Sequence, residues 1–199
     1  GGLVGRNDGT VTHSSASGNV SGSSFIRGLV GNNGDSIEES YATGNVTGNG
    51  FRTGGLVGSN SGTVADSYAT ATVSGDEDVG GLVGNNGGGT LTNSYAAGGV
   101  AGNSNVGGLV GAQSGTVSDS YWNLETTNQS GSNGGTGLTT LQMVGNAATN
   151  QLTFDFSNTW TVIDRVDNGN EVSYPILQNN TQTPAPGLQT LYDGGMGTV

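Results

Sequence analysis

Apolar and polar positions recur along the first part of this chain with a fixed period. The phrase Gly-Leu-Val-Gly occurs five times, with its leucines at positions 3, 29, 56, 82 and 109. The intervals between these leucines are 26, 27, 26 and 27 residues. A fixed period in this range indicates a repeat architecture, in which each unit packs on its neighbours. Because repeat arrays mostly present surfaces, the pattern favours a binding or structural role over catalysis.

Further columns keep the same register. Four of them are an apolar column after Thr or Ser (Val11, Ile37, Val64, Leu91, Val117), a serine column (Ser14, Ser40, Ser67, Ser94, Ser120), an aromatic column (Tyr41, Tyr68, Tyr95, Tyr121) and an amide column (Asn7, Asn33, Asn60, Asn86, Gln113). Each unit thus holds three short apolar pieces separated by turn residues. The pieces are too short, and too rich in Gly, Thr and Val, for helices.

Stacking these units lets each strand pair with its copy in the next coil. We therefore expect an all-β fold over residues 1–122, a three-faced β-solenoid of about five coils that start near residues 2, 28, 55, 81 and 108. Coils about 4.8 Å apart give a rod roughly 24 Å long. The general chirality of β connections favours a right-handed coil.

The alternation within one unit predicts which side chains face the core. Ser67, Ala69, Ala71 and Val73 are small or apolar and occupy the odd positions. A thin coil has room only for small residues inside, so we expect this set to face inward. The tyrosine column would then form a stripe on one outer face. The opposite assignment, with the tyrosines inside, stays open.

The repeat unit resembles a known one. Gly-Gly-Leu-Val-Gly, then Asn, Gly-Thr-Val, Ser-Tyr-Ala and Val-Ser-Gly look like the GLUG repeat over residues 1 to about 122. That repeat belongs to large secreted and cell-surface proteins of bacteria and archaea, including adhesin-like proteins and some IgA-cleaving proteases. The resemblance implies an extracellular or cell-surface location. Catalysis in the protease relatives lies in a separate zinc domain, and no His-Glu-x-x-His phrase occurs here, so it implies no peptidase activity.

The pattern stops after residue 122. Large apolar side chains gather between 138 and 177, and Thr139 or Thr140 is placed to cap a short helix over Leu141 and Met143. We expect residues 123–180 to cap the open solenoid end, and residues 181–199 to be a linker or docking tail. The start of the chain shows no comparable cap. We expect either preceding residues of a longer protein or a second subunit there, and the second option would build a head-to-tail filament.

Composition narrows the range of partners. The net charge is −11, there is no lysine, and the only cations are Arg6, Arg27, Arg52 and Arg165. This balance excludes nucleic acid and an anionic membrane surface as partners, because both need clustered Lys and Arg. There is no cysteine, and no apolar run approaches the roughly 20 residues of a membrane helix.

Few residues suggest chemistry. His13 is the only histidine, and its column holds Glu39, Asp66, Asn93 and Asp119 in the other units, which indicates a variable exposed position rather than a catalytic base. The acidic run Asp76, Glu77 and Asp78 is a candidate calcium site, with simple solvation as the alternative. The Gly-Gly-Leu-Val-Gly phrases lack the lysine and spacing of a phosphate-binding loop. We expect no other cofactor.

Two regions are candidates for binding. The segments 23–27, 49–53, 76–79 and 103–106 vary while the frame repeats, and they should stack along one edge as exposed loops. Phe25, Arg27, Phe51 and Arg52 would then form an aromatic and cationic patch. The alternative is that Phe25 and Phe51 fill the corner of the core. The second region is the tyrosine stripe Tyr41, Tyr68, Tyr95 and Tyr121.

Glycosylation is a further expectation. Four Asn-x-Ser/Thr sequons occur, with acceptor residues Asn19, Asn45, Asn128 and Asn179. Taken together, the sequence predicts a non-enzymatic extracellular structural or adhesive rod, self-associating or joined to neighbouring domains. The alternatives are a glycan- or receptor-binding adhesin module and an accessory segment of a large secreted enzyme.

Overall fold

The computed structural model describes residues 2–22, 27–165 and 171–180. The chain forms two compact units, Gly1–Thr139 and Thr140–Val199. The expected tail, 181–199, lies outside the described residues.

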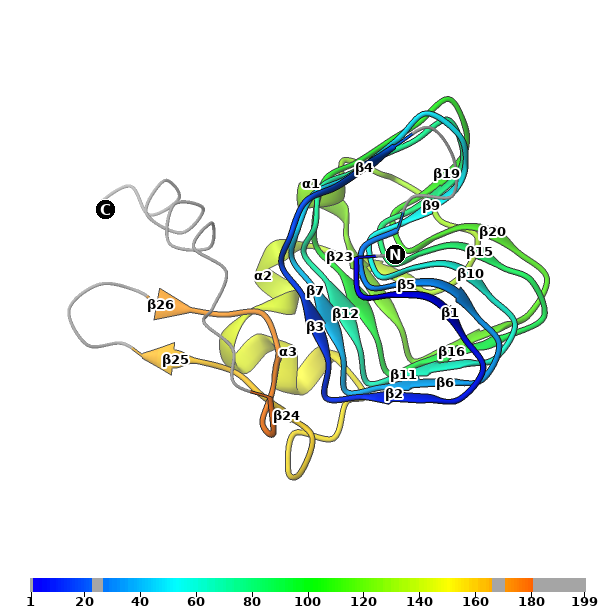
Figure 1. Ribbon diagram of the computed structural model, residues 1–199. Coiled ribbons are helices and arrows are strands. Elements are labelled where there is room, and N and C mark those ends of the chain that lie inside the picture. The colour runs from blue at the N-terminus through cyan, green and yellow to red at the C-terminus, as the bar shows by residue number, and fades with distance from the viewer. Residues whose placement is uncertain (1, 23–26, 166–170, 181–199) are drawn as a thin grey trace. The chain divides into compact units, whose positions relative to one another are not determined.

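The first unit is a β-solenoid, in which parallel strands stack from one coil to the next (Figure 1). Sheet A comprises β1 (Val4–Asn7), β5 (Val30–Asn33), β10 (Val57–Asn60), β15 (Val83–Asn86) and β20 (Val110–Gln113). Sheet B comprises β2 (Thr10–Thr12), β6 (Ser36–Glu38), β11 (Thr63–Ala65), β16 (Thr90–Thr92) and β21 (Thr116–Ser118). Sheet C comprises β3 (Ser15–Ala16), β7 (Tyr41–Ala42), β12 (Tyr68–Ala69), β17 (Tyr95–Ala96), β22 (Tyr121–Asn123) and β23 (Thr136–Leu138).

Two further sheets complete the coil. Sheet D comprises β4 (Val20–Gly22), β8 (Val46–Gly48), β13 (Val73–Ser74) and β18 (Val100–Ala101). Sheet E comprises β9 (Phe51–Gly54), β14 (Glu77–Gly80) and β19 (Ser104–Gly107). The register follows the sequence period, because Val57 pairs with Val30 on one side and with Val83 on the other. The predicted β-solenoid is therefore confirmed.

The coil contains more strands than the three pieces read from the sequence. Sheets A, B and C surround the main core, while sheets D and E form a lobe that folds back toward sheet A (Figure 1). The segments 49–53, 76–79 and 103–106, expected as exposed loops, do stack along one edge, but they do so as the strands of sheet E. Val79 and Val106 pack there with Val73 and Val100 in a small second core.

Close backbone packing explains the last glycine of Gly-Leu-Val-Gly. A Cβ on Gly84 would lie 2.7 Å from the carbonyl carbon of Arg52, and a Cβ on Gly111 would lie 2.5 Å from the backbone nitrogen of Val79. Strands of sheet E therefore lie directly on the backbone of sheet A. Any side chain at these positions would push the two sheets apart.

The main core is a narrow column of aliphatic side chains. Its fully buried members include the leucine and valine of the repeated phrase in coils two to five, and Ala42, Ala69 and Ala96 of sheet C. Ser67, Ala69, Ala71 and Val73 are all 0% exposed, which confirms that this set faces inward. Ala69 packs in the main core, whereas Ala71 and Val73 pack in two smaller clusters.

Polar ladders run through the interior beside this core. Asn7, Asn33, Asn60 and Asn86 are buried, and each side-chain Nδ2 of the first three donates to the Oδ1 one coil further on, at 2.7, 2.8 and 2.9 Å. The serine column forms a second ladder, in which Ser67 Oγ accepts from the backbone nitrogen of Ser40 at 3.2 Å. Buried polar groups are tolerated here because the stacking gives each one a partner.

The corner between sheets B and C has a left-handed backbone in every coil. His13, Glu39, Asp66, Asn93 and Asp119 have φ values of 48°, 44°, 44°, 46° and 46°. Asn and Asp tolerate this conformation better than other non-glycine residues. The column that the sequence showed as variable is therefore a corner whose shared requirement is a positive φ.

The last coil is closed by residues 123–139, which belong to the same compact unit as the coils. Helix α1 (Leu124–Thr127) begins after Asn123, whose side chain accepts hydrogen bonds from the backbone nitrogens of Glu125 and Thr126. Strand β23 then pairs in parallel with β22. Ser132 Oγ accepts from the backbone nitrogen of Val110 at 2.9 Å, and Gln129 Nε2 donates to the Val100 carbonyl at 2.9 Å.

The second unit is small and mixed. It comprises α2 (Thr140–Met143), α3 (Gly145–Gln151), β24 (Trp160–Thr161) paired with β27 (Ile176–Leu177), and β25 (Asp164–Arg165) paired with β26 (Glu171–Val172). Helix α2 begins where the sequence predicted a cap. Trp160 is fully buried, and its ring stacks on Phe154 with the ring centroids 4.8 Å apart.

Candidate functional site

Sheet E carries the exposed aromatic residue that the sequence singled out. Phe51, Glu77 and Ser104 form one column by register, and the Phe51 side chain is 58% exposed. The alternative that Phe51 fills the corner of the core is therefore wrong. Beside it, Arg52 and Asp78 have positive φ values of 61° and 52°.

Asp78 is the centre of a polar network on this sheet. Its Oδ1 accepts from Asn105 Nδ2 at 2.9 Å, its Oδ2 accepts from Asn85 Nδ2 at 3.2 Å, and Arg52 Nε lies 4.0 Å from Oδ2. The Asp78 side chain is only 13% exposed, whereas that of Arg52 is 47% exposed. The network therefore fixes the orientation of several planar polar groups at the edge of the lobe.

The acidic run does not form the expected calcium site. Asp76 bonds to Asn103 of the next coil, as Asp78 does to Asn105. Within the described ranges, no three His, Cys, Asp or Glu side chains converge closely enough to hold a metal ion. Stacking directs these carboxylates toward amides in the neighbouring coil, so adjacency along the chain does not bring their oxygens around one point.

Arg27 is not part of an exposed patch with Phe51, because its side chain is buried. It is only 7% exposed, and a Cβ on Gly58 would lie 2.0 Å from its Nε. Its side chain thus covers glycines of sheet A that the backbone of sheet E covers in later coils. Burial, and then the charge of Arg52, lower the pKa of Arg27. Phe25 lies outside the described residues, so the described, exposed part of the predicted patch is Phe51 with Arg52.

The tyrosine column is not an exposed stripe. Tyr68, Tyr95 and Tyr121 are buried, with exposed fractions of 5%, 1% and 7%, and Tyr41 is half-buried. The ring centroids of Tyr41 and Tyr68 are 5.1 Å apart and those of Tyr68 and Tyr95 are 5.0 Å apart, so each ring covers the face of the next. Burial, and then the neighbouring Tyr41, raise the pKa of Tyr68 above its ordinary value. The predicted outer stripe of tyrosines is therefore wrong, because most of these side chains are buried.

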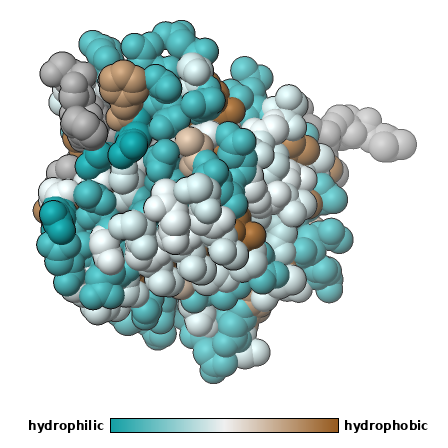
Figure 2. Space-filling view, turned by 90° about the vertical axis from the view of Figure 1, so that its right-hand side faces the viewer, coloured by the Kyte–Doolittle hydropathy of each residue, from teal (hydrophilic) through white to brown (hydrophobic). Residues whose placement is uncertain are grey.

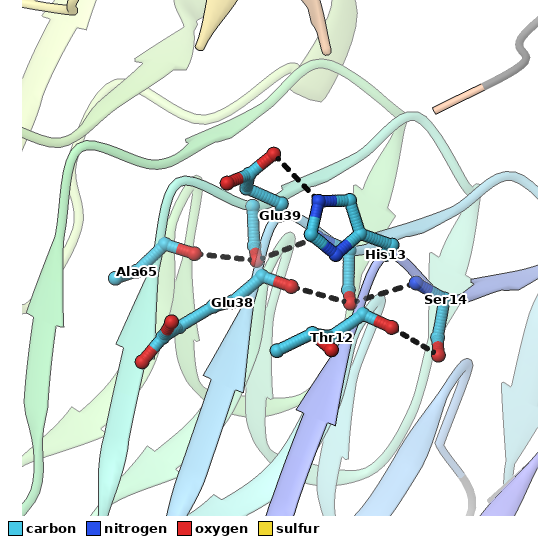
Figure 3. Close-up of polar contacts among 8 residues, drawn as sticks. Thr12, His13, Ser14, Glu38, Glu39 and Ala65 are labelled. Carbon is cyan, nitrogen blue, oxygen red and sulfur yellow. Dashed lines mark hydrogen bonds and ion pairs between the residues drawn. The ribbon is translucent and has the colours of Figure 1, made fainter. Parts of the chain in front are cut away.

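His13 lies at the corner between sheets B and C (Figure 3). Its Nε2 is 3.1 Å from Glu39 Oε2, in the same column one coil further on. The backbone nitrogen of His13 donates to the Glu38 carbonyl at 3.3 Å. The side chain is 48% exposed. Ser14 Oγ donates to the Thr12 carbonyl at 2.8 Å, so the hydroxyl proton of this neighbouring serine is engaged with the backbone and not with the imidazole.

All four sequon asparagines are exposed: Asn19, Asn45, Asn128 and Asn179. Asn19 Oδ1 accepts from the backbone nitrogen of Asn45, and Asn45 Oδ1 accepts from that of Thr72. Asn128 ends α1 with a positive φ of 55°. Their glycosylation stays a prediction.

The remaining surface offers little concentrated chemistry. A shallow hollow of about 360 Å³ is lined by Gln113, Ser114, Gly115, Asn133 and Gly134, none of which titrates. Figure 2 shows a face on which hydrophobic residues are scattered among polar and near-neutral ones. Over the described part of the chain, no helix is long and apolar enough to cross a membrane.

The architecture is that of a β-solenoid repeat protein in which residues 129–138 bond to the last coil at sheets A, C and D. The sequence model of the GLUG motif matches residues 1–21 and 49–74, so these stretches of the solenoid carry the GLUG motif. The searches of curated proteins and of solved structures found no match.

Sequence reasoning missed the amide side of the sheet E network. Asn85 was not singled out. Asn103 and Asn105 lie in the candidate segment 103–106, but their bonds to Asp76 and Asp78 were not predicted, although these residues align one repeat apart. That alignment of amides with carboxylates one repeat apart was the available signal. It predicts hydrogen bonds between coils once the segment is known to be a strand.

Proposed function

We propose that this chain is a non-enzymatic, extracellular segment that acts as a stiff structural or adhesive element of a cell-surface protein. The observation that carries the proposal is the in-register ladder of buried asparagines, which links successive coils by hydrogen bonds of 2.7–2.9 Å. Such ladders resist sliding of one coil over the next, because any slip leaves buried amides without partners.

The distribution of reactive groups supports a role without catalysis. The single histidine, His13, lies beside the Glu39 carboxylate of the next coil. The hydroxyl oxygens of the serine column accept hydrogen bonds from backbone nitrogens of the preceding coil. The residues that vary between repeats lie on sheet E and at the corners, where they change the surface without changing the frame.

Head-to-tail filament growth is the less supported form of this proposal. Growth would need free strand edges on the last coil, but residues 129–138 already bond to the edges of sheets A, C and D. An individual rod, or one rod within a longer chain, agrees better with this closure. The accessory segment of a large secreted enzyme remains an alternative proposal with the same surfaces.

Immunogold labelling of intact cells of the source organism tests the proposed location. The proposal predicts gold on the outer surface of unpermeabilised cells. Labelling that appears only after permeabilisation would contradict it. Force spectroscopy on the purified chain tests the stiffness separately, where the coils should resist extension and rupture cooperatively rather than unravel at low force.

A further inference from the structure

We infer that the sheet E strip, defined as Phe51, Arg52, Asp78, Asn103 and Asn105, binds a neutral saccharide. This inference rests on the proposed function and names the ligand class of its adhesive surface.

The first step is the aromatic anchor. Among the described residues, the exposed large hydrophobic side chains are Leu3, Phe51 and Leu141, and Phe51 is the aromatic one. A flat ring exposed beside polar groups is complementary to the apolar C–H face of a pyranose ring. Aromatic and Arg residues are also those enriched where binding energy concentrates.

The second step is the set of planar polar groups that follows the Phe51 column by one position along the strands of sheet E. Asp78 Oδ1 accepts a hydrogen bond from Asn105 Nδ2 at 2.9 Å, and Asp78 Oδ2 lies 4.0 Å from Arg52 Nε. A guanidinium, a carboxylate and an amide thus form one row across neighbouring coils. Asp76 and Asn103 form a parallel pair. Successive members of a row lie on neighbouring strands, about 4.8 Å apart, and so offer donors and acceptors to successive hydroxyls of one sugar chain.

The third step is the local charge, which decides between neutral and acidic saccharides. Asp76, Glu77 and Asp78 outnumber Arg52 on this sheet, and the whole chain carries a net charge of −11. A sulfated or carboxylated sugar would be repelled by this field. The ligand class is therefore an uncharged polysaccharide of hexoses or N-acetylhexosamines, which can contact several coils at once.

The test begins with the intact 199-residue chain on an array that carries both neutral and acidic polysaccharides. The best neutral oligosaccharide is then titrated by calorimetry against wild type, Phe51→Ala and Phe51→Tyr. Leu141→Ala is the matched control, because Leu141 is equally apolar and 67% exposed but has no such row beside it. Melting curves check that each variant is folded.

We expect Phe51→Ala to weaken binding at least ~10-fold, Phe51→Tyr to retain it and Leu141→Ala to leave it unchanged. Binding of acidic saccharides alone, no binding of neutral ones, or equal binding by Phe51→Ala would each overturn the inference. If one of these results is found while immunogold labels the outer cell surface, only the saccharide site is overturned and the proposed function stands. Labelling confined to the cell interior overturns the proposed function, whatever the array shows.

Discussion

Asn33 Nδ2 donates a hydrogen bond of 2.8 Å to Asn60 Oδ1, and these residues lie in adjacent coils at the same step of the repeat. Neither side chain has appreciable contact with solvent, since their exposed fractions are 0% and 1%. The repeat period of the sequence thus becomes a line of amide-to-amide hydrogen bonds along the rod.

Replacing Asn60 should therefore be costly. In Asn60→Ala, Asn33 Nδ2 loses an acceptor and Asn86 Oδ1 loses a donor, so two buried groups lose a partner. We expect a loss of about 3 kcal/mol in the free energy of unfolding, measured by urea denaturation. Asn32→Ala is the control, because Asn32 is exposed on β5, the strand that carries the bonded Asn33. Equal losses for the two variants would show that the ladder contributes no stability of its own.

The glycines of the repeated phrase allow a second comparison at one motif position. A Cβ on Gly84 would lie 2.7 Å from the Arg52 carbonyl carbon, whereas a Cβ on Gly5 would meet nothing within 4 Å. Gly84→Ala should lower the unfolding free energy by about 3 kcal/mol, and Gly5→Ala should change it little. Thermal melts of both variants provide the measurement. A harmless Gly84→Ala would mean that sheet E does not lie on sheet A.

These two cases show what the sequence can and cannot predict. The period fixed the stacking register, and side-chain size predicted that Ala69 and Val73 face inward, because a thin coil excludes larger groups. The fold-back of sheet E was missed, because Val79 and Val106 stand alone among polar residues and carry no alternating pattern. Their burial arises only when the lobe closes.

The candidate site, like the fold, was predicted only in part from the sequence. Alternation predicts which side of a strand Tyr95 occupies, but it does not predict whether that side is covered, and the ring is 1% exposed. Arg27 was expected in the exposed patch because it belongs to the variable segment 23–27, yet it covers Gly58. Phe51 is exposed, as predicted, and its described partner in the column, Glu77, is polar.

Substitutions at the positive-φ corner should separate backbone strain from side-chain contacts. Asn93 has a φ of 46°, a conformation that alanine adopts only with strain. Asn93→Ala should cost about 1 kcal/mol, whereas Asn93→Gly should be close to neutral. Chemical denaturation of the pair provides the answer. If glycine proved as harmful as alanine, the backbone conformation would not be the reason.

The stacked tyrosines predict a loss of stability at high pH. Burial and Tyr41 raise the pKa of Tyr68 above its ordinary value of 10.0, so the folded state binds the phenolic proton more tightly than the unfolded state does. This contribution is complete below pH 10 and is lost progressively as the pH rises above 10. Unfolding free energies measured from pH 8 to 11.5 should fall at the upper end, and Tyr68→Phe should fall less steeply. Identical slopes would contradict the assignment.

The central claim is that the stacked coils end in a closed edge and act as an individual rod. Electron microscopy of negatively stained protein, with sedimentation velocity over a wide range of concentrations, tests this most directly. The account predicts separate particles without filaments, because residues 129–138 already bond to the edges of sheets A, C and D, where a second copy would have to pair. Ordered filaments that lengthen with concentration, with an axial repeat of one rod, would contradict it.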